Sequence, residues 1–458
     1  MFILMVVVFV LGYVAIALEH PLKVDKAASA LIIGTLCWVI YAVGAEDILA
    51  LGYSPSWEAF MHGHSGNITE SVHEFLVESE IIHHLGEISE ILFFLLGAMT
   101  IVEMVDQHEG FKVITDRIKT TNKVKLLWIL SFLTFFMSAL LDNLTTTIVL
   151  VALLRKLVDD KETRWFFASM VVLAANAGGA WSPIGDVTTI MLWIGGQVTA
   201  ARIIEGVILP SLACMIVPLG ILSFTMKGNV QRPAIDGDEN GLTTGVERIF
   251  MLIIGVSGLL FVPVFKTITH LPPYMGMLLS LGIIWVISEV MHKNKPDEIR
   301  HHLRVAAVLR KVDVPTVLFF LGILSAVASL QSAGHLHLLS QYLDEKLGNI
   351  YLIDLAVGVL SSVVDNVPLV AGAMGMYPTA DPGTTGYLAS FVQDGVFWEF
   401  LAYTAGTGGS ILIIGSAAGV AAMGLEKIDF IWYMKKISVL AIVGYLSGAA
   451  VYYFLFAV

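Results

Sequence analysis

The sequence predicts an all-α polytopic membrane protein, and composition is the first observation that does so. Of the 458 residues, 57% are hydrophobic and 14% are charged, whereas a soluble globular domain carries about 25% charged residues. The second observation is a series of uncharged stretches near or above about 17 residues, the length that a helix needs to cross a bilayer. The net charge of −12, without a basic stripe, excludes a nucleic-acid partner.

About ten stretches are expected to become transmembrane helices, two of them broken. The first lacks a basic leader and a small-residue cleavage site, so we expect it to be retained and not removed as a signal peptide. The expected stretches are Phe2–Leu18, Ala28–Val43, Ile88–Val105, Trp165–Gly195, Ile203–Met226, Ile249–Phe265, Tyr274–Met291, Val314–Ser332, Leu388–Met423 and Ile437–Phe456.

Two further stretches, 126–154 and 350–377, are too long for one crossing and too short for two crossings with a turn, since each has about 28 residues. Charge decides how they lie. Of the 26 basic residues, all except Arg202, Lys266 and Lys346 fall in segments assigned to one side, which the positive-inside rule makes cytoplasmic. Both flanks of the first stretch are then cytoplasmic and both flanks of the second external. We therefore expect two re-entrant hairpins that enter from opposite sides.

The two halves of the chain repeat each other. A Ser-x-x-x-Asp-Asn motif occurs at Ser138 and again, 223 residues later, at Ser361. Each motif is followed by a Gly-rich break in an apolar stretch, at 165–195 and at 388–423. The sequence thus predicts a first repeat at 1–226, a cytoplasmic linker at 227–247 and a second, inverted repeat at 248–458. Inverted repeats whose broken helices meet at the bilayer midplane are typical of secondary transporters.

The hairpin tips and the helix breaks carry the candidate binding residues. Ionisable groups at membrane depth are costly and usually mark an ion or substrate path. Carboxylate and amide oxygens are the hard ligands that a small cation prefers. The cation- or proton-binding candidates are Asp142, Asn143, Asn176, Asp186, Thr188, Thr189, Ser361, Asp365, Asn366, Thr407 and Ser410.

Each candidate also has a purely structural interpretation. Asp142 could cap a half-helix through an Asx turn, Asp186 could be the N-cap of a second half-helix, and Ser or Thr can simply bond the preceding turn. The sign of the charge favours a functional role, because the motifs hold three Asp and no Lys or Arg. A carboxylate shielded from water can hold a proton or a cation in turn. The pattern therefore predicts cation/proton antiport, with Na⁺ at Asp142, Asn143 and Asp186.

At these motifs the chain resembles the NhaD-type sodium/proton antiporters of the ion transporter superfamily. The stretches that carry the resemblance begin at Glu19, Ile91, Leu140, Asn176 and Ser361 and read EHPLK, ILFFLLGAMTIVE, LLDNLTTT, NAGGAWSPIGDVTT and SSVVDNVP. The resemblance implies a bacterial inner-membrane homodimer that exchanges Na⁺ or Li⁺ for H⁺ in pH homeostasis, with no cofactor and no enzymatic activity. It also implies that these candidates, with the exception of Asp365, form the ion site: Asp142, Asn143, Asn176, Asp186, Thr188, Thr189, Ser361 and Asn366, with Thr407 and Ser410 at the matching second break.

Two alternatives stay open. Relatives in that superfamily carry arsenite or dicarboxylates, and neutral arsenite would escape the repulsion that an anion meets near the three Asp. A channel or a membrane enzyme is the second alternative. Transport that saturates and is lost in Asp142→Asn would argue against it.

Overall fold

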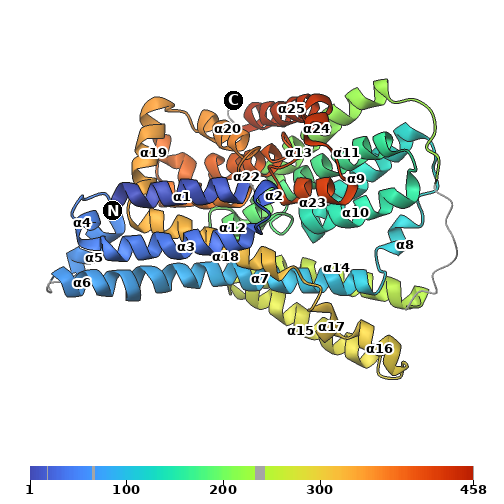
Figure 1. The fold of residues 1–458 in the computed structure, drawn as a ribbon, viewed down its shortest axis with the longest axis horizontal. Helices are drawn as coiled ribbons and strands as arrows, with labels where there is room; N and C mark the ends of the chain where they lie inside the picture. Colours follow the sequence, from blue (N-terminus) through green and yellow to red (C-terminus); the bar gives the residue numbers. More distant parts are fainter. Residues whose placement is uncertain (18, 64–67, 233–242, 457–458) are drawn as a thin grey trace. The chain divides into compact units, whose positions relative to one another are not determined.

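The computed structural model describes residues 1–17, 19–63, 68–232 and 243–456, and over these ranges the chain is helical without a β-strand (Figure 1). Eight of the described helical runs are long and apolar enough to cross a membrane, which confirms the predicted polytopic all-α fold. They are Lys26–Val43, Ser71–Gln107, Lys123–Leu141, Ala200–Thr225, Gly245–Thr269, Pro273–Met291, Val314–Ser332 and Ser438–Phe456.

The chain divides into two compact units, and each takes segments from both predicted repeats. The first unit consists of Met1–Leu92, Asp313–Ile353 and Val367–Gln393, and the second of Phe93–Val312, Asp354–Asn366 and Asp394–Val458. The predicted repeat boundaries stay a prediction. About half of the predicted linker, residues 233–242, lies outside the described residues. Its last residues belong to a helix, because Thr244 and Glu247 form a reciprocal capping box that starts α14 at Gly245.

In the first unit, α1 (Phe2–Ala17), α3 (Lys26–Val43) and α18 (Val314–Ser332) lie side by side (Figure 1). At the crossing of α3 and α18, Gly34 faces the carbonyl of Gly322 so closely that a Cβ would clash. Small residues allow such close backbone approach between apolar helices. The other helices that lie entirely within this unit are α2 (Glu19–Leu22), α4 (Ala45–Leu49), α5 (Pro55–Gly63), α6 (Ile68–Glu74), η1 (Phe75–Ile81), α19 (His335–Lys346) and η2 (Gly386–Phe391).

The helix expected at 88–105 is longer than predicted. It forms α7 (Ile82–Gln107), which continues from α6 through the π-helical turn η1. Residues 82–87, which precede the expected stretch, are therefore also helical. The side chains on this stretch support the helix, because His84 lies within ion-pair distance of Glu80 (3.6 Å) and Glu87 (3.3 Å), four and three residues away.

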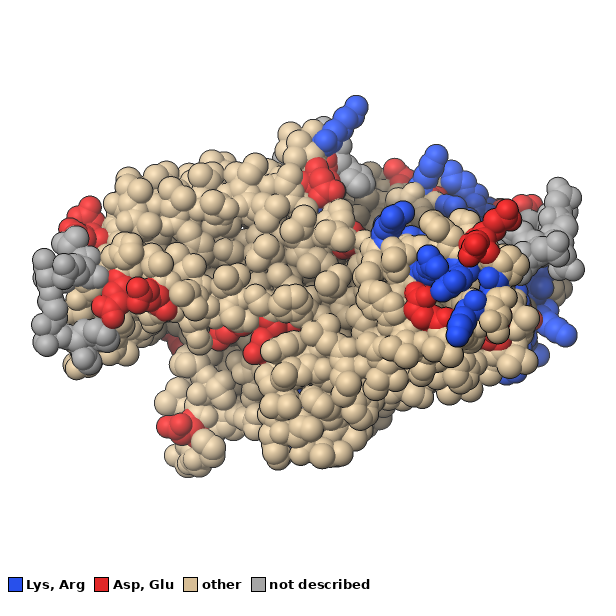
Figure 2. Space-filling model, turned by 90° about the horizontal axis from the view of Figure 1, so that it is seen from below, with Lys and Arg blue, Asp and Glu red and all other residues tan. Residues whose placement is uncertain are grey.

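The second unit contains the first hairpin and both broken helices. α9 (Lys123–Leu141) packs on α11 (Lys161–Ala180), and α13 (Ala200–Thr225) packs on α25 (Ser438–Phe456). Its other helices are α8 (Lys112–Thr115), α10 (Asn143–Leu157), α12 (Val187–Ile194), α14 (Gly245–Thr269), α15 (Pro273–Met291), α16 (Asp297–Leu303), α17 (Val305–Val308), α22 (Val396–Gly408), α23 (Ala417–Glu426) and α24 (Phe430–Lys436). Figure 2 shows Lys and Arg side chains gathered at the end of the drawn face where α8 and α16 lie.

The two ends of the first hairpin lie close together. The amide of Lys123, at the start of α9, donates to the carbonyl of Gly228 (3.1 Å). The amide of Asp159, just after α10, donates to the carbonyl of Gln231 (2.9 Å). Both ends of the hairpin therefore lie beside the same short segment, 228–231, and the chain reverses between α9 and α10 at Asp142 alone.

The second hairpin is formed by α20 (Ile350–Leu360) and α21 (Asn366–Met376). The Tyr377 hydroxyl, just after α21, donates to the Asp344 carboxylate near the end of α19 (3.0 Å). Because α19 leads directly into α20, the two ends of this hairpin also lie together. Its tip spans residues 361–365, in contrast to the single residue of the first tip.

Each of the two stretches predicted as broken helices holds two consecutive helices, and the start of the second stretch differs from the prediction. The first runs as α11 and α12, separated by residues 181–186, and the second as α22 and α23, separated by residues 409–416. The second begins at Val396 and not at 388, because residues 386–391 form the 3₁₀ helix η2. Asp394, with φ of 62°, separates the two elements. Its carboxylate accepts a bond from the amide of Thr199 (2.6 Å), which holds this turn in place.

Candidate functional site

The carboxylate of Asp186 is the centre of a buried polar cluster. Asp186 is the N-cap of α12 and is 1% exposed. It accepts bonds from the amide of Thr188 (3.1 Å), from Asn143 Nδ2 (2.8 Å) and from Asn366 Nδ2 (3.2 Å). The first hairpin, the first helix break and the second hairpin thus meet at one carboxylate.

Asn176 extends this cluster to the second broken helix. Its Oδ1 accepts a bond from Asn143 Nδ2 (3.1 Å), and its own Nδ2 donates to the hydroxyls of Ser410 and Ser416 (2.9 Å each). An amide nitrogen has two hydrogens, so both bonds can form together. Four predicted candidates besides Asp186 are therefore joined to it directly or through Asn143: Asn143, Asn176, Asn366 and Ser410.

Asp142 positions the first hairpin. It has a φ of 76°, in the left-handed region that non-glycine residues rarely adopt. Its carboxylate accepts bonds from the amide and the hydroxyl of Thr145 (2.8 Å each), and so caps α10. These bonds place Asn143 at the first position of α10, where its side chain reaches Asp186. The structure thus displays the capping role for Asp142, and its role as a cation ligand stays a prediction.

Three further candidates bond to backbone carbonyls. Ser361 donates to Ala405 (2.8 Å) and ties the tip of the second hairpin to α22. Thr407 donates to the carbonyl four residues earlier (2.6 Å), and Thr189 donates to the carbonyl of its own N-cap residue (2.9 Å). In each case the hydroxyl supports the backbone near the cluster.

The remaining two candidates differ in burial. Thr188 is fully buried, and its hydroxyl has no hydrogen-bond partner among the described side chains and backbone. Asp365 is half-buried beside Asn366 and is near enough to Asp186 to interact with it electrostatically. Thr188 therefore offers a free hydroxyl oxygen at the cluster, and Asp365 adds negative charge close to it.

One member of the cluster, Ser416, is absent from the predicted candidates. It is the N-cap of α23 and is 2% exposed. Ser416 follows Gly415 as Asp186 follows Gly185, at the 230-residue offset between the two breaks. The alignment of the two breaks could have identified Ser416 from the sequence. A serine is less conspicuous than an aspartate in an apolar stretch, because it carries no charge.

The cluster differs from two other buried carboxylates of this unit, Glu426 and Glu399, in lacking a basic partner. Glu426 forms ion pairs with Arg155 Nε (2.7 Å) and Arg164 Nε (2.5 Å), and Glu399 forms one with Arg202 Nε (2.7 Å). Among the ion pairs of the described chain, none involves Asp186. Its negative charge is balanced only by neutral donors, so the site attracts a cation and repels an anion.

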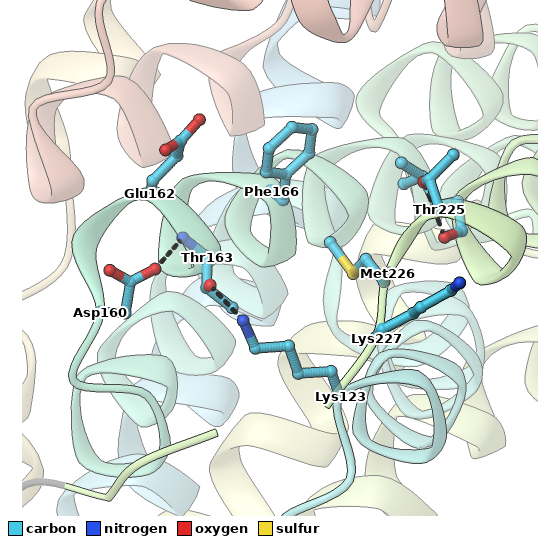
Figure 3. A pocket seen from close by; sticks show the side chains of 9 residues that line it. Lys123, Asp160, Glu162, Thr163, Phe166, Thr225, Met226 and Lys227 are labelled. Atoms are coloured by element: carbon cyan, nitrogen blue, oxygen red, sulfur yellow. Dashed lines mark hydrogen bonds between the residues drawn. The ribbon is translucent and has the colours of Figure 1, made fainter. Parts of the chain in front are cut away.

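A separate cavity of about 530 Å³ lies where α9, α11 and α13 begin or end (Figure 3). Asp160 accepts a bond there from the amide of Thr163 (2.8 Å), and Lys123 donates to the hydroxyl of the same residue (3.0 Å). Lys123 and Lys227 line this cavity together with Asp160 and Glu162. It has charges of both signs, unlike the cluster at Asp186.

Comparison with known proteins gives a consistent set of relatives. A family model described as a citrate transporter (CitMHS) matches residues 2–392. Sodium/proton antiporters 1 and 2 of Arabidopsis thaliana are 44% and 42% identical over 98% of this chain, covering 71% and 98% of the relatives. The Na⁺/H⁺ antiporter NhaD of Vibrio cholerae is 30% identical over 93% of this chain and 86% of its own length.

Proposed function

Because the chain belongs to the citrate transporter (CitMHS) family, and within it to the sodium/proton antiporters of the NhaD type, we propose that it is a secondary active antiporter exchanging Na⁺ or Li⁺ for H⁺. The observation that carries the proposal is the cluster at Asp186. A buried carboxylate without a basic partner, surrounded by amide and hydroxyl groups, is a site for a small cation or for a proton.

The exchange follows from competition for one carboxylate. Asn143 and Asn366 donate to Asp186 through their amide nitrogens. Rotation of either side-chain amide presents its oxygen in place of its nitrogen. The groups that stabilise the carboxylate without a cation can therefore become ligands when Na⁺ arrives. A proton neutralises the same carboxylate and removes the attraction for Na⁺, so the two ions exclude each other.

Alternating access would arise from the two hairpins. Asn143 belongs to the first and Asn366 to the second, and both bond to the carboxylate of Asp186. If the hairpins enter from opposite sides, as the sequence predicts, loosening one contact while keeping the other opens the site to one side at a time. Such rocking around a fixed midplane site is typical of inverted-repeat transporters. We further propose a homodimer in a bacterial inner membrane, on the basis of the resemblance to the NhaD type.

Citrate transport is the second candidate, since the matching family model bears that description. A carboxylate substrate would meet the uncompensated charge of Asp186, and no Lys or Arg is paired with that residue among the described contacts. The cluster therefore favours a cation over citrate. Neutral arsenite meets no such repulsion, so only an experiment can distinguish arsenite transport from cation transport.

Dequenching of a pH-sensitive dye in everted membrane vesicles tests the proposal. After respiration has acidified the vesicles, Na⁺ and Li⁺ are expected to collapse the proton gradient, whereas citrate and arsenite are expected to leave it intact. Vesicles with Asp186→Asn are the control, because this variant keeps the size of the side chain and loses its charge. A gradient that responds to citrate alone would overturn the proposal. So would an ohmic, non-saturating Na⁺ current.

A further inference from the structure

A second buried acid, Asp354, lies outside the cluster at Asp186. It belongs to α20, the first arm of the second hairpin, and is fully buried. Neither of its carboxylate oxygens has a hydrogen-bond partner among the described residues, and no ion pair of the described chain involves it. Burial of an ionised carboxylate without any partner is strongly unfavourable, and binding a proton removes this cost.

The other fully buried acids of this unit are compensated. Asp186 accepts bonds from two Asn side chains and a backbone amide. Glu399 is paired with Arg202 and accepts a bond from Tyr452 (2.9 Å), and Glu426 is paired with two Arg side chains. The surroundings of Asp354 are therefore suited to the neutral acid, whereas theirs are suited to the anion.

Asp354 lies on the face of α20 that packs into the protein. Gly358 and Ser361 follow it at i+4 and i+7, so the three share one side of the helix. A Cβ at Gly358 would lie 2.7 Å from the carbonyl oxygen of Thr404 and would clash with the Tyr445 hydroxyl. Ser361 donates to Ala405 on the same helix, α22. This face is thus held against α22 and α25.

The titratable groups around Asp354 are neutral side chains. Tyr445 of α25 is close enough to Asp354 to interact with it electrostatically, and its hydroxyl donates to the carbonyl of Leu355 (3.1 Å). Cys214 of α13 and Tyr403 of α22 lie next to Tyr445. None of these groups is a cation at any pH, so only a proton can neutralise the acid in place.

We propose that Asp354 is a second proton-binding site of the transport cycle, one that takes a proton and no metal cation. The proposal rests on the antiport function argued above. A metal ion needs several oxygen ligands, and Asp354 lacks the amide and hydroxyl partners that surround Asp186. Two helical turns, about 10 Å, separate Asp354 from Ser361 at the hairpin tip. Movement of this hairpin would therefore carry the proton-bearing acid with it.

The first repeat provides a natural control. At the offset of 223 that relates Ser138 to Ser361, the residue matching Asp354 is Ser131. Ser131 is also buried, and its hydroxyl also has no partner among the described residues. The position is therefore polar in both halves, but only the second half has an acid there.

Two measurements on the full-length protein in liposomes test the proposal. In infrared spectra, the wild type is expected to show a protonated carboxylic acid that titrates with pH and is missing in Asp354→Asn. In proteoliposomes, the ratio of H⁺ to Na⁺ that balances opposing gradients is expected to fall by about one proton per cation in Asp354→Asn, and to stay unchanged in Ser131→Ala.

The two measurements distinguish failure of the proposed function from failure of the proposal on Asp354. If the wild type exchanges no Na⁺ for H⁺, the proposed function is wrong, but the infrared band still decides whether Asp354 binds a proton. Absence of that band in the wild type, or an unchanged ratio in Asp354→Asn, overturns the proposal. Should Asp354→Asn fold poorly, Asp354→Ser introduces the residue that the first repeat has at this position, and the same lower ratio is expected.

Discussion

The two broken helices, α11–α12 and α22–α23, make the same contacts with the two hairpins. A Cβ at Gly178 would clash with the carbonyl of Phe135 in α9, and a Cβ at Gly408 would clash with the carbonyl of Gly358 in α20. The hydroxyls that anchor the tips also correspond, since Ser138 donates to Ala175 (2.6 Å) and Ser361 to Ala405 (2.8 Å). The backbone framework around the site is therefore present twice.

The acid at the helix break is present once. The N-cap of α12 is Asp186, and the N-cap of α23 is Ser416. Asn176 joins the two, because it donates to Ser416 and accepts from the same Asn143 that donates to Asp186. A framework that is repeated while its acid is not creates one negatively charged centre between two matching supports. We infer that the repeated backbone framework sets the geometry of the site and that Asp186 provides the affinity for the cation.

Exchange of Asp186 for Asn is expected to have the largest effect. The variant keeps the N-cap and the side-chain size but loses the charge, so Na⁺-dependent proton flux should fall at least about 100-fold, equivalent to about 2.7 kcal/mol. Flux in proteoliposomes at saturating Na⁺ measures this. If Ser416→Ala lowers the flux as much as Asp186→Asn does, the two N-caps contribute equally. The proposed difference between the two helix breaks is then wrong.

The matching glycines are expected to affect folding before transport. Gly178→Ala and Gly408→Ala each force a methyl group against a backbone carbonyl, which should destabilise the protein by about 1–3 kcal/mol. Gly220→Ala in α13 is the matched control, since a Cβ there meets nothing within 4 Å. Thermal unfolding in detergent measures all three. Equal melting temperatures for Gly408→Ala and Gly220→Ala would show that the close contact is absent.

The comparison extends to the hairpin tips, where Asp142 and Asp365 occupy matching positions. The prediction concerns the first of them. Asp142→Asn keeps an effective N-cap for α10 while removing a charge near Asp186. We expect the apparent Na⁺ affinity to fall about tenfold, less than in Asp186→Asn. Titration of flux with Na⁺ at constant pH measures the change. A variant that loses Na⁺ transport entirely would show that Asp142 is itself a ligand, as the sequence predicts.

Hydrophobicity was sufficient to predict the all-α membrane fold, because membrane depth imposes a strong pattern on a sequence. Boundaries that depend on local turns were not predictable. Asp394 lies between η2 and α22, and it holds the turn before the second broken helix through a bond from Thr199, a partner 195 residues away. Likewise, the sequence marks Asp142 as polar at a hairpin tip but cannot show that its oxygens face Thr145 while Asn143 faces Asp186. Side-chain direction at a tip depends on φ and on tertiary contacts.

Ser416→Ala is expected to have the smallest effect and to sharpen the comparison most. Asn176 keeps Ser410 as a partner when Ser416 is lost, so removal of one neutral hydrogen bond should reduce Na⁺ affinity only about three- to fivefold. In this variant and in the wild type, apparent Na⁺ affinity should still fall as pH falls, because protons compete for Asp186. Flux titrations with Na⁺ at several pH values measure both effects. A flat pH profile in Ser416→Ala would show that proton competition depends on the second break as much as on Asp186, contrary to the assignment of affinity to Asp186.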